Sequence, residues 1–546
     1  MYIVDVRLKS SMFEIMREAS QELVRHCGGS CHPTVSTLLT RAIENKLRKM
    51  TLDHAGSSEI YVTSEDLVLE GQGSIEINAT PTQAQKSIVR SLMKVVLHQM
   101  DNGIHILTEG QENLLVSLCV ESLQVEVSIP DTVFRKSQMT IEEEVAQIFN
   151  PSSSDGLQDS EEVRRDYYIK CYRCVKCGEL GLESRQIAED FDKIDIQEPS
   201  TVNSDDESTL VCIHPMLPNV SISAETMTQT RVQLLPSSEF EGLWESLHFE
   251  DSKLKQNLLG YATISLKLSH FSQRKLSDTL VSNNKLLLVH GPPGTGKTTV
   301  CKALCQKLAI RHSGVTQNIF EASESQAIFI ELSCSRVFSR WFGESAKNLD
   351  RIFQDVENIL MNRSNEDRFV CLLIDEVETL ASSRSSSMNK NETTDCVRVV
   401  NTLLTRLDGL KQYNNLLILA TSNLVTALDP AFLDRADGVF YVGKPSEIGT
   451  SKILYSTIRE LVKNRVVISN LSDTAALNSA EEIRSSIHQI ARQCVTSGVS
   501  GRTLRKLPLI CLSEHLSSLP VPIRDFLLAL ALTVRRISTL PNQEPI

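Results

Sequence analysis

The sequence lacks any run of the about 18–20 apolar residues that a membrane-spanning helix requires. Its first residues also lack the basic region and the long apolar run that together make a secretory signal. We therefore expect no membrane span, and we expect the protein to be intracellular. The 14 cysteines are then expected to be reduced thiols, because disulfides are rare in reducing compartments.

An excess of positive charge is also missing. The chain has 56 lysine and arginine residues against 68 aspartate and glutamate residues, a net charge of -12. Because a nonspecific grip on nucleic acid needs basic residues that neutralise phosphates, we expect protein partners and no direct sequence-specific binding of nucleic acid. The 12 histidines form no His-Glu-x-x-His pattern, which excludes a built-in zinc protease of the type that carries this motif.

The length of 546 residues is enough for about three to four compact units. Two polar, turn-rich tracts at residues 151–166 and 196–209 indicate flexible acidic insertions. Before the first tract, apolar residues alternate with polar ones over 123–129, which predicts a half-buried strand, and residues 88–100 carry apolar side chains at helical spacing. These patterns predict an N-terminal α+β domain over residues 1–237.

The middle of the chain contains short apolar runs separated by helical segments. The runs are residues 286–289, 328–332, 370–374, 416–420 and 439–442, of which the second is interrupted by Glu331. Strands that are apolar almost throughout are buried on both faces, as in a parallel sheet with helices on either side. We predict a doubly wound α/β domain over 238–445, followed by a small helical lid over 446–546, where apolar residues recur at helical spacing.

A glycine-rich loop directly follows the first apolar run and precedes a helix-compatible segment. This order is the structural context of a phosphate-binding loop, whose backbone N–H groups wrap the phosphates of a nucleotide. Lys297 is predicted to reach the β- and γ-phosphates of ATP and Thr298 to ligate Mg²⁺. The alternative is a chance Gly/Pro turn before a helix. The predicted ATP-binding residues are Gly291, Pro292, Pro293, Gly294, Thr295, Gly296, Lys297 and Thr298.

Two further apolar runs end in polar residues that suit ATP hydrolysis. Asp375 and Glu376 close one run, where Asp375 is predicted to hold Mg²⁺ through its water shell and Glu376 to deprotonate the attacking water. Asn423 follows the next run, at the edge where open α/β sheets present their ligand crevice. We predict that it positions the water alongside Glu376. The alternatives are solvated acids that end a strand and a turn-forming Asn.

Taken together, these residues resemble the AAA+ ATPases, and residues 401–409 and 428–437 resemble the second region of homology of the AAA clade. The resemblance implies an AAA+ module with a small helical lid, and a ring, by resemblance a homo-hexamer. Most relatives carry two arginines after the Asp-Pro-Ala element, but here only Arg435 lies in that neighbourhood. Arg435 is therefore predicted to be the arginine finger for the neighbouring subunit. The alternative is a surface arginine paired with Asp434 or Asp437.

The lid segment 500–508, Ser-Gly-Arg-Thr-Leu-Arg-Lys-Leu-Pro, resembles the sensor-2 region of the pachytene checkpoint AAA+ ATPase family. Residues 240–247 and 397–401 are similar to that family as well. The resemblance implies that Arg502 contacts the nucleotide from the lid. It also implies a HORMA-domain protein as the client, with or without an adaptor, in meiotic or spindle checkpoint control. The N-terminal domain would recruit this client, and the protein would be nuclear and chromosome-associated, with the nucleolus and the cytoplasm as further locations.

In AAA+ unfoldases, the segment after the second core strand holds a pore loop whose aromatic side chain grips an extended chain. Trp341 and Phe342 occupy that place, and Trp341 is one of only two tryptophans. The alternative is that Trp341 packs on a neighbouring helix. The resemblance also marks Gly443 as pore-proximal, and the tract 381–395 is a candidate second pore loop.

Other interpretations stay open. A general protein unfoldase or a microtubule-severing ATPase would use the same mechanism, whereas a clamp-loader-like nucleic-acid motor belongs to a different class. The charge of -12 disfavours a grip on acidic tubulin tails, and the lack of a basic stripe disfavours the nucleic-acid motor. Whether zinc is bound is also open: the short-spaced groups Cys27/Cys31 and Cys171/Cys174/Cys177 look like metal ligands, but they lie far apart in the sequence.

Overall fold

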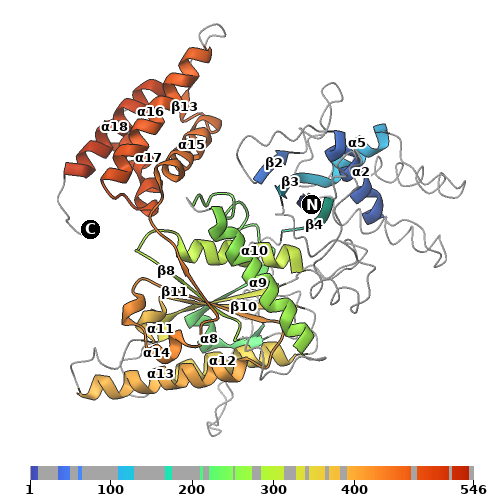
Figure 1. Cartoon of the computed structure of the whole chain (residues 1–546), viewed down its shortest axis with the longest axis vertical. Coiled ribbons are helices and arrows are strands. Elements are labelled where there is room, and N and C mark those ends of the chain that lie inside the picture. Colours follow the sequence, from blue (N-terminus) through green and yellow to red (C-terminus); the bar gives the residue numbers. More distant parts are fainter. Residues whose placement is uncertain are drawn as a thin grey trace, which may run out of the picture. The chain divides into compact units, whose positions relative to one another are not determined.

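The computed structural model describes residues 2–9, 35–49, 59–63, 109–127, 167–174, 210–212, 221–249, 252–272, 284–312, 327–337, 344–362, 368–381, 390–468, 476–515 and 519–539. These residues form two compact units, one that ends at Cys174 and one that begins, among the described residues, at Leu210 (Figure 1). The helix predicted at 88–100 and the insertions predicted at 151–166 and 196–209 lie outside the described residues.

The first unit is a mixed sheet with helices. Its described elements are β1 (Tyr2–Leu8), α2 (Val35–Lys49), β2 (Glu59–Thr63), α5 (Glu109–Cys119), β3 (Val120–Val127) and β4 (Tyr167–Tyr172). The strand order is β2-β3-β1-β4, with β1 antiparallel to β3 and parallel to β4. Leu123 and Val125 of β3 are buried as their spacing predicts, but Ser122 and Gln124 on the opposite face are buried too. The α+β class is confirmed. The alternation of apolar and polar residues predicted the position of β3, but it did not reveal that the polar face of this strand is also buried.

The second unit is built on a six-stranded sheet. Before the lid, its described elements are β5 (Leu210–Cys212), β6 (Ser221–Ser223), α8 (Ala224–Gln229), β7 (Thr230–Leu235), α9 (Ser252–Ser272), β8 (Leu286–His290), α10 (Lys297–His312), β9 (Ala327–Ser333), α11 (Cys334–Val337), α12 (Glu344–Met361), β10 (Phe369–Asp375), η3 (Val377–Thr379), α13 (Lys390–Leu410), β11 (Leu416–Ser422), η4 (Val425–Ala427), α14 (Pro430–Leu433) and β12 (Gly438–Tyr441). The strand order is β12-β8-β11-β10-β9-β7, and every pairing is parallel except that of β7 with β9. The predicted parallel sheet is confirmed.

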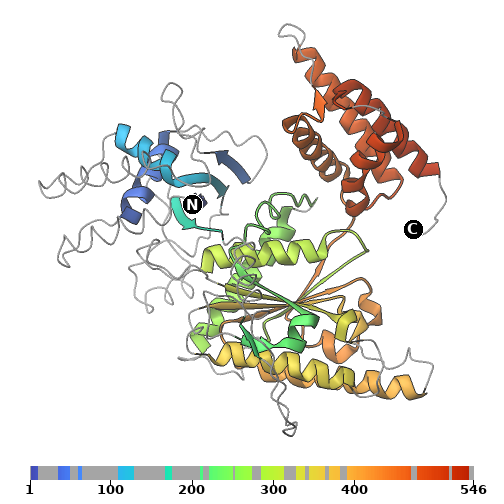
Figure 2. The same ribbon diagram turned by 180° about the vertical axis from the view of Figure 1, so that it is seen from behind.

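The central strands β8, β10 and β11 are almost entirely buried because helices cover both faces of the sheet. Successive side chains of a strand point to opposite faces, so Leu286 and Leu288 of β8 join a core with α12 and α13. Leu287 and Val289 join a second core with α9 and α10. Figures 1 and 2 show the sheet between these two helix layers. The carboxyl ends of the parallel strands are therefore brought to one edge of the sheet, where the loop after β8 also lies.

The antiparallel edge strand was not foreseen. Residues up to 237 were predicted to belong to the N-terminal domain, but β7 pairs with β9 from Thr230 to Leu235 and is part of the six-stranded sheet. Without β7, β9 would present a row of unpaired N–H and C=O groups along an open edge. The predicted boundary at 237 therefore falls inside the second unit, after β5, β6, α8 and β7.

The residues after 445 form a helical lid, as predicted. Its described elements are α15 (Glu447–Lys463), β13 (Val467–Ile468), α16 (Ala476–Thr496), α17 (Gly501–His515), β14 (Val521–Pro522) and α18 (Ile523–Thr539). These helices share a core that includes Leu454, Ile490, Leu507 and Phe526. Among the helices in the described part of the chain, none is both long enough and apolar enough to cross a membrane.

Candidate functional site

The glycine-rich loop joins β8 to α10 in a conformation that depends on glycine. Gly291, Gly294 and Gly296 have φ angles of +152°, +75° and +96°, which residues with a Cβ rarely adopt. Lys297, the first residue of α10, folds back so that its Nζ donates to the carbonyl oxygens of Gly291 and Pro292, both at 2.9 Å. The loop therefore wraps around the ammonium group at the place where phosphates are expected.

Replacing Gly291 with alanine is expected to destabilise the second unit. An added Cβ would lie 2.1 Å from the carbonyl oxygen of Val442, and the backbone strain alone costs about 1–3 kcal/mol. Thermal unfolding should show a clearly lower Tm. The matched control is Gly260→Ala in α9, where an added Cβ meets nothing within 4 Å and alanine is the better helix former. An unchanged Tm for Gly291→Ala would contradict the close approach of the loop to β12.

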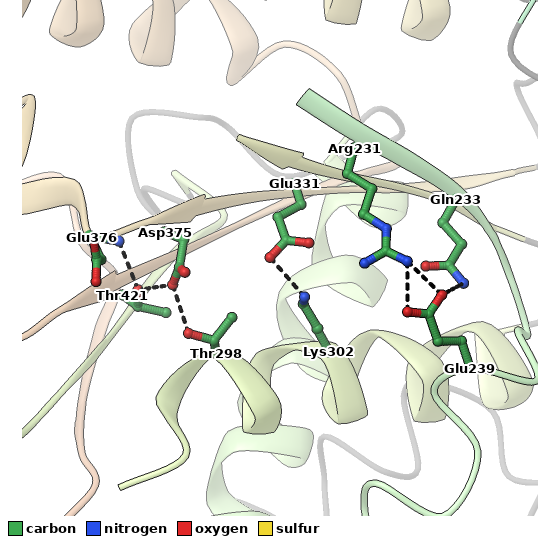
Figure 3. A network of polar contacts seen from close by, with 9 residues as sticks. All are labelled: Arg231, Gln233, Glu239, Thr298, Lys302, Glu331, Asp375, Glu376 and Thr421. Atoms are coloured by element: carbon green, nitrogen blue, oxygen red, sulfur yellow. Dashed lines mark hydrogen bonds and ion pairs between the residues drawn. The ribbon is translucent and has the colours of Figure 1, made fainter. Parts of the chain in front are cut away.

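Asp375, the last residue of β10, accepts hydrogen bonds from two hydroxyl groups. The Oγ1 of Thr298 donates to Asp375 Oδ1 at 2.8 Å, and the Oγ1 of Thr421 donates to the same oxygen at 2.5 Å (Figure 3). The backbone N–H of Glu376 in turn donates to Thr421 Oγ1 at 3.0 Å. The sequence did not lead us to predict Thr421 as a site residue, although Thr421 lies near the end of β11, two residues before Asn423. These contacts bring the two predicted magnesium ligands together as oxygen donors of the type that Mg²⁺ prefers.

Glu376 has an unusual backbone conformation. Its φ and ψ angles of 57° and 50° are left-handed, although it is not glycine, and its side chain is exposed. Such a conformation is costly and persists where the surrounding structure demands it, often at functional sites. Here it turns the chain sharply between β10 and η3 and leaves the carboxylate at the wall of a cavity.

Lys297 also connects the loop to Asn423. Its Nζ donates to Asn423 Oδ1 at 2.7 Å, which joins the start of α10 to the residue that follows β11. Burial lowers the pKa of Lys297, and the carboxylates of Glu378, Asp375 and Glu376 oppose this change. The three acids therefore favour the charged ammonium in a partly desolvated place.

A cavity of about 900 Å³ lies over the loop, between the strand ends and the lid. Arg502 lines it, and the backbone N–H of Arg502 donates to the carbonyl oxygen of Gly294 at 3.0 Å. Gly443, which was predicted to lie near a pore, lines this cavity too. Residues 246–249 and Lys506 also contribute to the wall. The sequence predicted no role in the site for them, although Lys506 lies in the lid segment 500–508 and residues 246–247 lie in the segment 240–247 that resembles the family. Of the predicted residues, the lining includes Pro293, Gly294, Thr295, Gly296, Lys297, Thr298, Asp375, Glu376, Asn423, Gly443 and Arg502.

Arg435 lies elsewhere. It is not among the described residues that line the cavity, and its Nε and Nη2 donate to the two carboxylate oxygens of Asp408 at 3.0 and 2.7 Å. This bidentate contact is the main reason why the pKa of Asp408 falls to about 2. The partner is thus Asp408 of α13, rather than the Asp434 or Asp437 considered from the sequence.

Some predicted residues are not covered. Trp341 and Phe342 lie outside the described residues, as do Cys27, Cys31 and Cys177. Cys171 and Cys174 are buried, and burial raises the pKa of Cys171 to about 12. Within the described ranges, no group of three or more His, Cys, Asp and Glu side chains could hold a metal ion. The zinc hypothesis therefore stays untested.

Comparison with known proteins agrees with this arrangement. Residues 287–444 match the family model "ATPase family associated with various cellular activities (AAA)", and residues 448–538 match "TRIP13-like, AAA+ ATPase lid C-terminal domain". Pachytene checkpoint protein 2 of Saccharomyces cerevisiae is 40% identical over 569 residues, which cover 98% of this chain and 99% of the relative. Its homologue from Xenopus tropicalis is 37% identical over 59% of this chain and 72% of the relative.

A solved structure of C. elegans PCH-2 has the same fold, with a TM-score of 0.51 and 23% identity over 84% of this chain and 97% of that chain. The fold, the loop and the family match define an AAA ATPase, which binds and hydrolyses ATP. The chain belongs to the pachytene checkpoint protein 2 family. The similarity to the yeast protein extends through the N-terminal residues, where no motif had been recognised.

Proposed function

We propose that this chain forms a homo-hexameric ring that uses ATP hydrolysis to remodel HORMA-domain proteins in checkpoint control, in the nucleus and on chromosomes. The observation that carries the proposal is the similarity to pachytene checkpoint protein 2 over 98% of the chain, together with the TRIP13-like lid. The lid segment 500–508 already resembled that family, whose clients are HORMA-domain proteins. Such folds switch between two packings of one sequence, and local unfolding can interconvert them.

Residues of the loop bind the phosphates of ATP, and residues at the strand ends act on the attacking water. Lys297 leaves the carbonyl oxygens of Gly291 and Pro292 and binds the β- and γ-phosphates. Glu376, exposed at the cavity wall, takes a proton from the attacking water, and Asn423 holds that water in place. Arg502, whose backbone contacts the loop, transmits the state of the nucleotide to the lid.

Thr298 and Asp375 are the residues that fit a magnesium ion. Their oxygens lie 2.8 Å apart beside the loop, with Thr298 able to bind the ion directly and Asp375 through water. The ion neutralises charge on the β- and γ-phosphates when it is bound. Because Asp375 also accepts from Thr421, its carboxylate is held toward Thr298 before the nucleotide binds.

The site needs a second subunit. Arg435 does not line the cavity of its own chain within the described residues, and its guanidinium is held by Asp408 at the protein surface. An arginine supplied by a neighbouring subunit stabilises charge on the transferring phosphoryl group. The ring therefore completes each site and couples hydrolysis in one subunit to the position of the next.

Trp341→Ala is expected to separate hydrolysis from remodelling. Trp341 grips the extended end of the client, so its loss should leave ATP turnover within about twofold while release of the client's partner fails, because a large aromatic contact is removed. The measurement is ATP-driven release of a labelled partner peptide from a closed HORMA-domain protein. Recruitment by the N-terminal domain, with or without an adaptor, is tested by binding of the client in the absence of ATP.

The matched control is Tyr455→Ala, because Tyr455 is an exposed aromatic residue on α15 of the lid, with 50% of its surface accessible. It should change neither turnover nor release. Equal unfolding of unrelated proteins by the unmodified chain would replace the proposal with a general unfoldase. Turnover stimulated by DNA and unaffected by HORMA-domain proteins would replace it with a nucleic-acid motor.

A further inference from the structure

A third carboxylate, Glu378, contacts Asn423 but is not among the described residues that line the cavity. It lies in η3, two residues after Glu376. Its Oε1 accepts two hydrogen bonds from Asn423, one from the backbone N–H at 3.0 Å and one from Nδ2 at 2.9 Å. One oxygen therefore holds both the main chain and the side chain of the residue that is proposed to position the water.

The partners of Asn423 determine which way its amide group points. Lys297 carries only donors and an ionised Glu378 carries only acceptors. Lys297 Nζ lies 2.7 Å from Oδ1, and Glu378 Oε1 lies 2.9 Å from Nδ2. Exchanging the oxygen and nitrogen of the amide would place two donors together on one side and two acceptors together on the other. Asn423 therefore presents its oxygen to Lys297 and turns its nitrogen away.

Burying the second carboxylate oxygen of Glu378 has a cost in stability. Its second oxygen, Oε2, is buried and makes no hydrogen bond to the described part of the chain. Burying a polar atom without a partner is unfavourable, and such exceptions call for a functional reason. The Glu378 carboxylate is also the first of the charges that oppose the lowering of the Lys297 pKa by burial.

We infer that Glu378 is a positioning residue for ATP hydrolysis, which holds Asn423 with its Oδ1 toward the phosphate site and its Nδ2 away from it. Asn423 then offers a hydrogen-bond acceptor to Lys297 or to the attacking water. The inference rests on the proposed role of Asn423 in hydrolysis. It adds Glu378 as a positioning residue, and it specifies which way the amide group of Asn423 points.

The first test compares Glu378→Ala with Glu378→Gln in the full-length protein. Glutamine keeps an oxygen that can accept both hydrogen bonds from Asn423, whereas alanine keeps none. We expect kcat to fall about 10-fold or more for Glu378→Ala and to stay within about threefold for Glu378→Gln, as for other residues that orient a reacting group. The Kd for ATP should change little in both. Glu482→Ala is the control, since this lid carboxylate is exposed and pairs with Arg524.

The second test exchanges the hydrogen-bond donor at position 423 with the acceptor at position 378. Asn423→Asp places a carboxylate against Glu378 and should lower kcat strongly, because two negative groups then face each other. Adding Glu378→Gln supplies an amide N–H that can donate to the introduced carboxylate, while the other oxygen still faces Lys297. We expect the double variant to recover about 10-fold in kcat over Asn423→Asp alone. A residue that only supported the fold would not show this reciprocal rescue.

The outcomes separate the inference from the proposed function. An unchanged kcat for Asn423→Asp would remove the role of Asn423 and the inference with it. A low kcat for Asn423→Asp without rescue in the double variant, or a wild-type kcat for Glu378→Ala, would overturn the role of Glu378 and leave the role of Asn423 intact. Thermal unfolding of each variant shows whether a lost kcat reflects an unfolded protein. If Glu378→Ala does not fold, the comparison of Asn423→Asp with the double variant decides whether Glu378 has the inferred role.

Discussion

Glu376→Gln is expected to abolish ATP turnover while ATP still binds. Glutamine is nearly the same size as glutamate, so it can occupy the left-handed position after β10 and the same place at the cavity wall. It cannot accept a proton from water, and the loss of a general base lowers kcat by about 100-fold or more. Phosphate release under saturating ATP measures the first effect, and binding of a fluorescent nucleotide measures the second.

The lost proton acceptor has a second consequence. If hydrolysis resets the ring, Glu376→Gln should keep ATP bound and retain the client, which makes the variant a trap for identifying HORMA-domain proteins from its own cells. Glu482→Gln is the control, because it changes the same chemical group at an exposed position of the lid. Turnover at the unmodified rate in Glu376→Gln would show that another group takes the proton.

Arg435→Ala is expected to lower turnover by about 1,000-fold or more, the range known for arginine fingers that act between subunits. ATP binding should persist, since Arg435 is not among the described residues of the cavity wall. Turnover falls because the negative charge that develops on the transferring phosphoryl group loses its positive partner. Arg492→Ala is the control, because Arg492 is an exposed lid arginine that pairs with Glu447. An active Arg435→Ala variant would leave its pairing with Asp408 as its role.

Mixing subunits tests whether Arg435 acts across the interface. A Glu376→Gln subunit keeps Arg435 but lacks the proton acceptor, and an Arg435→Ala subunit keeps Glu376. Where the two meet in the right order, one subunit completes the other's site, so mixed rings should hydrolyse ATP faster than either variant alone. If the mixture is no more active than its components, the arginine acts within its own chain.

Local motifs predicted the central part of the site. The loop from Gly291 to Thr298 is continuous in sequence, and the strand before it and the helix after it are where the sequence places them. Asp375 ends β10 and Asn423 follows β11, and parallel pairing brings the ends of these buried strands to one edge of the sheet. Their proximity follows from the parallel pairing of the strands, which the apolar runs predicted, and from the strand order, which the tertiary structure shows.

Contacts between distant segments could not be predicted in the same way. Glu331 interrupts an apolar run, and only the packing of α10 on β9 shows that Lys302 neutralises it at 2.8 Å (Figure 3). The partner of Arg435 is likewise Asp408 of α13, and not one of the acids next to it in sequence. Which charges meet depends on how helices dock on the sheet, and no local pattern records that docking.

The sequence by itself determined the class of fold, the phosphate-binding loop and the acids and amide at the strand ends, because these depend on spacing within short segments. The tertiary structure alone decided that β7 pairs with β9 at the edge of the sheet, that residues 246–249 and the lid contribute to the cavity wall, and that Glu378 accepts hydrogen bonds from Asn423. The physical reason is that hydrogen bonds and ion pairs are short-ranged and directional. Their partners are therefore chosen only when the chain has brought remote residues within reach.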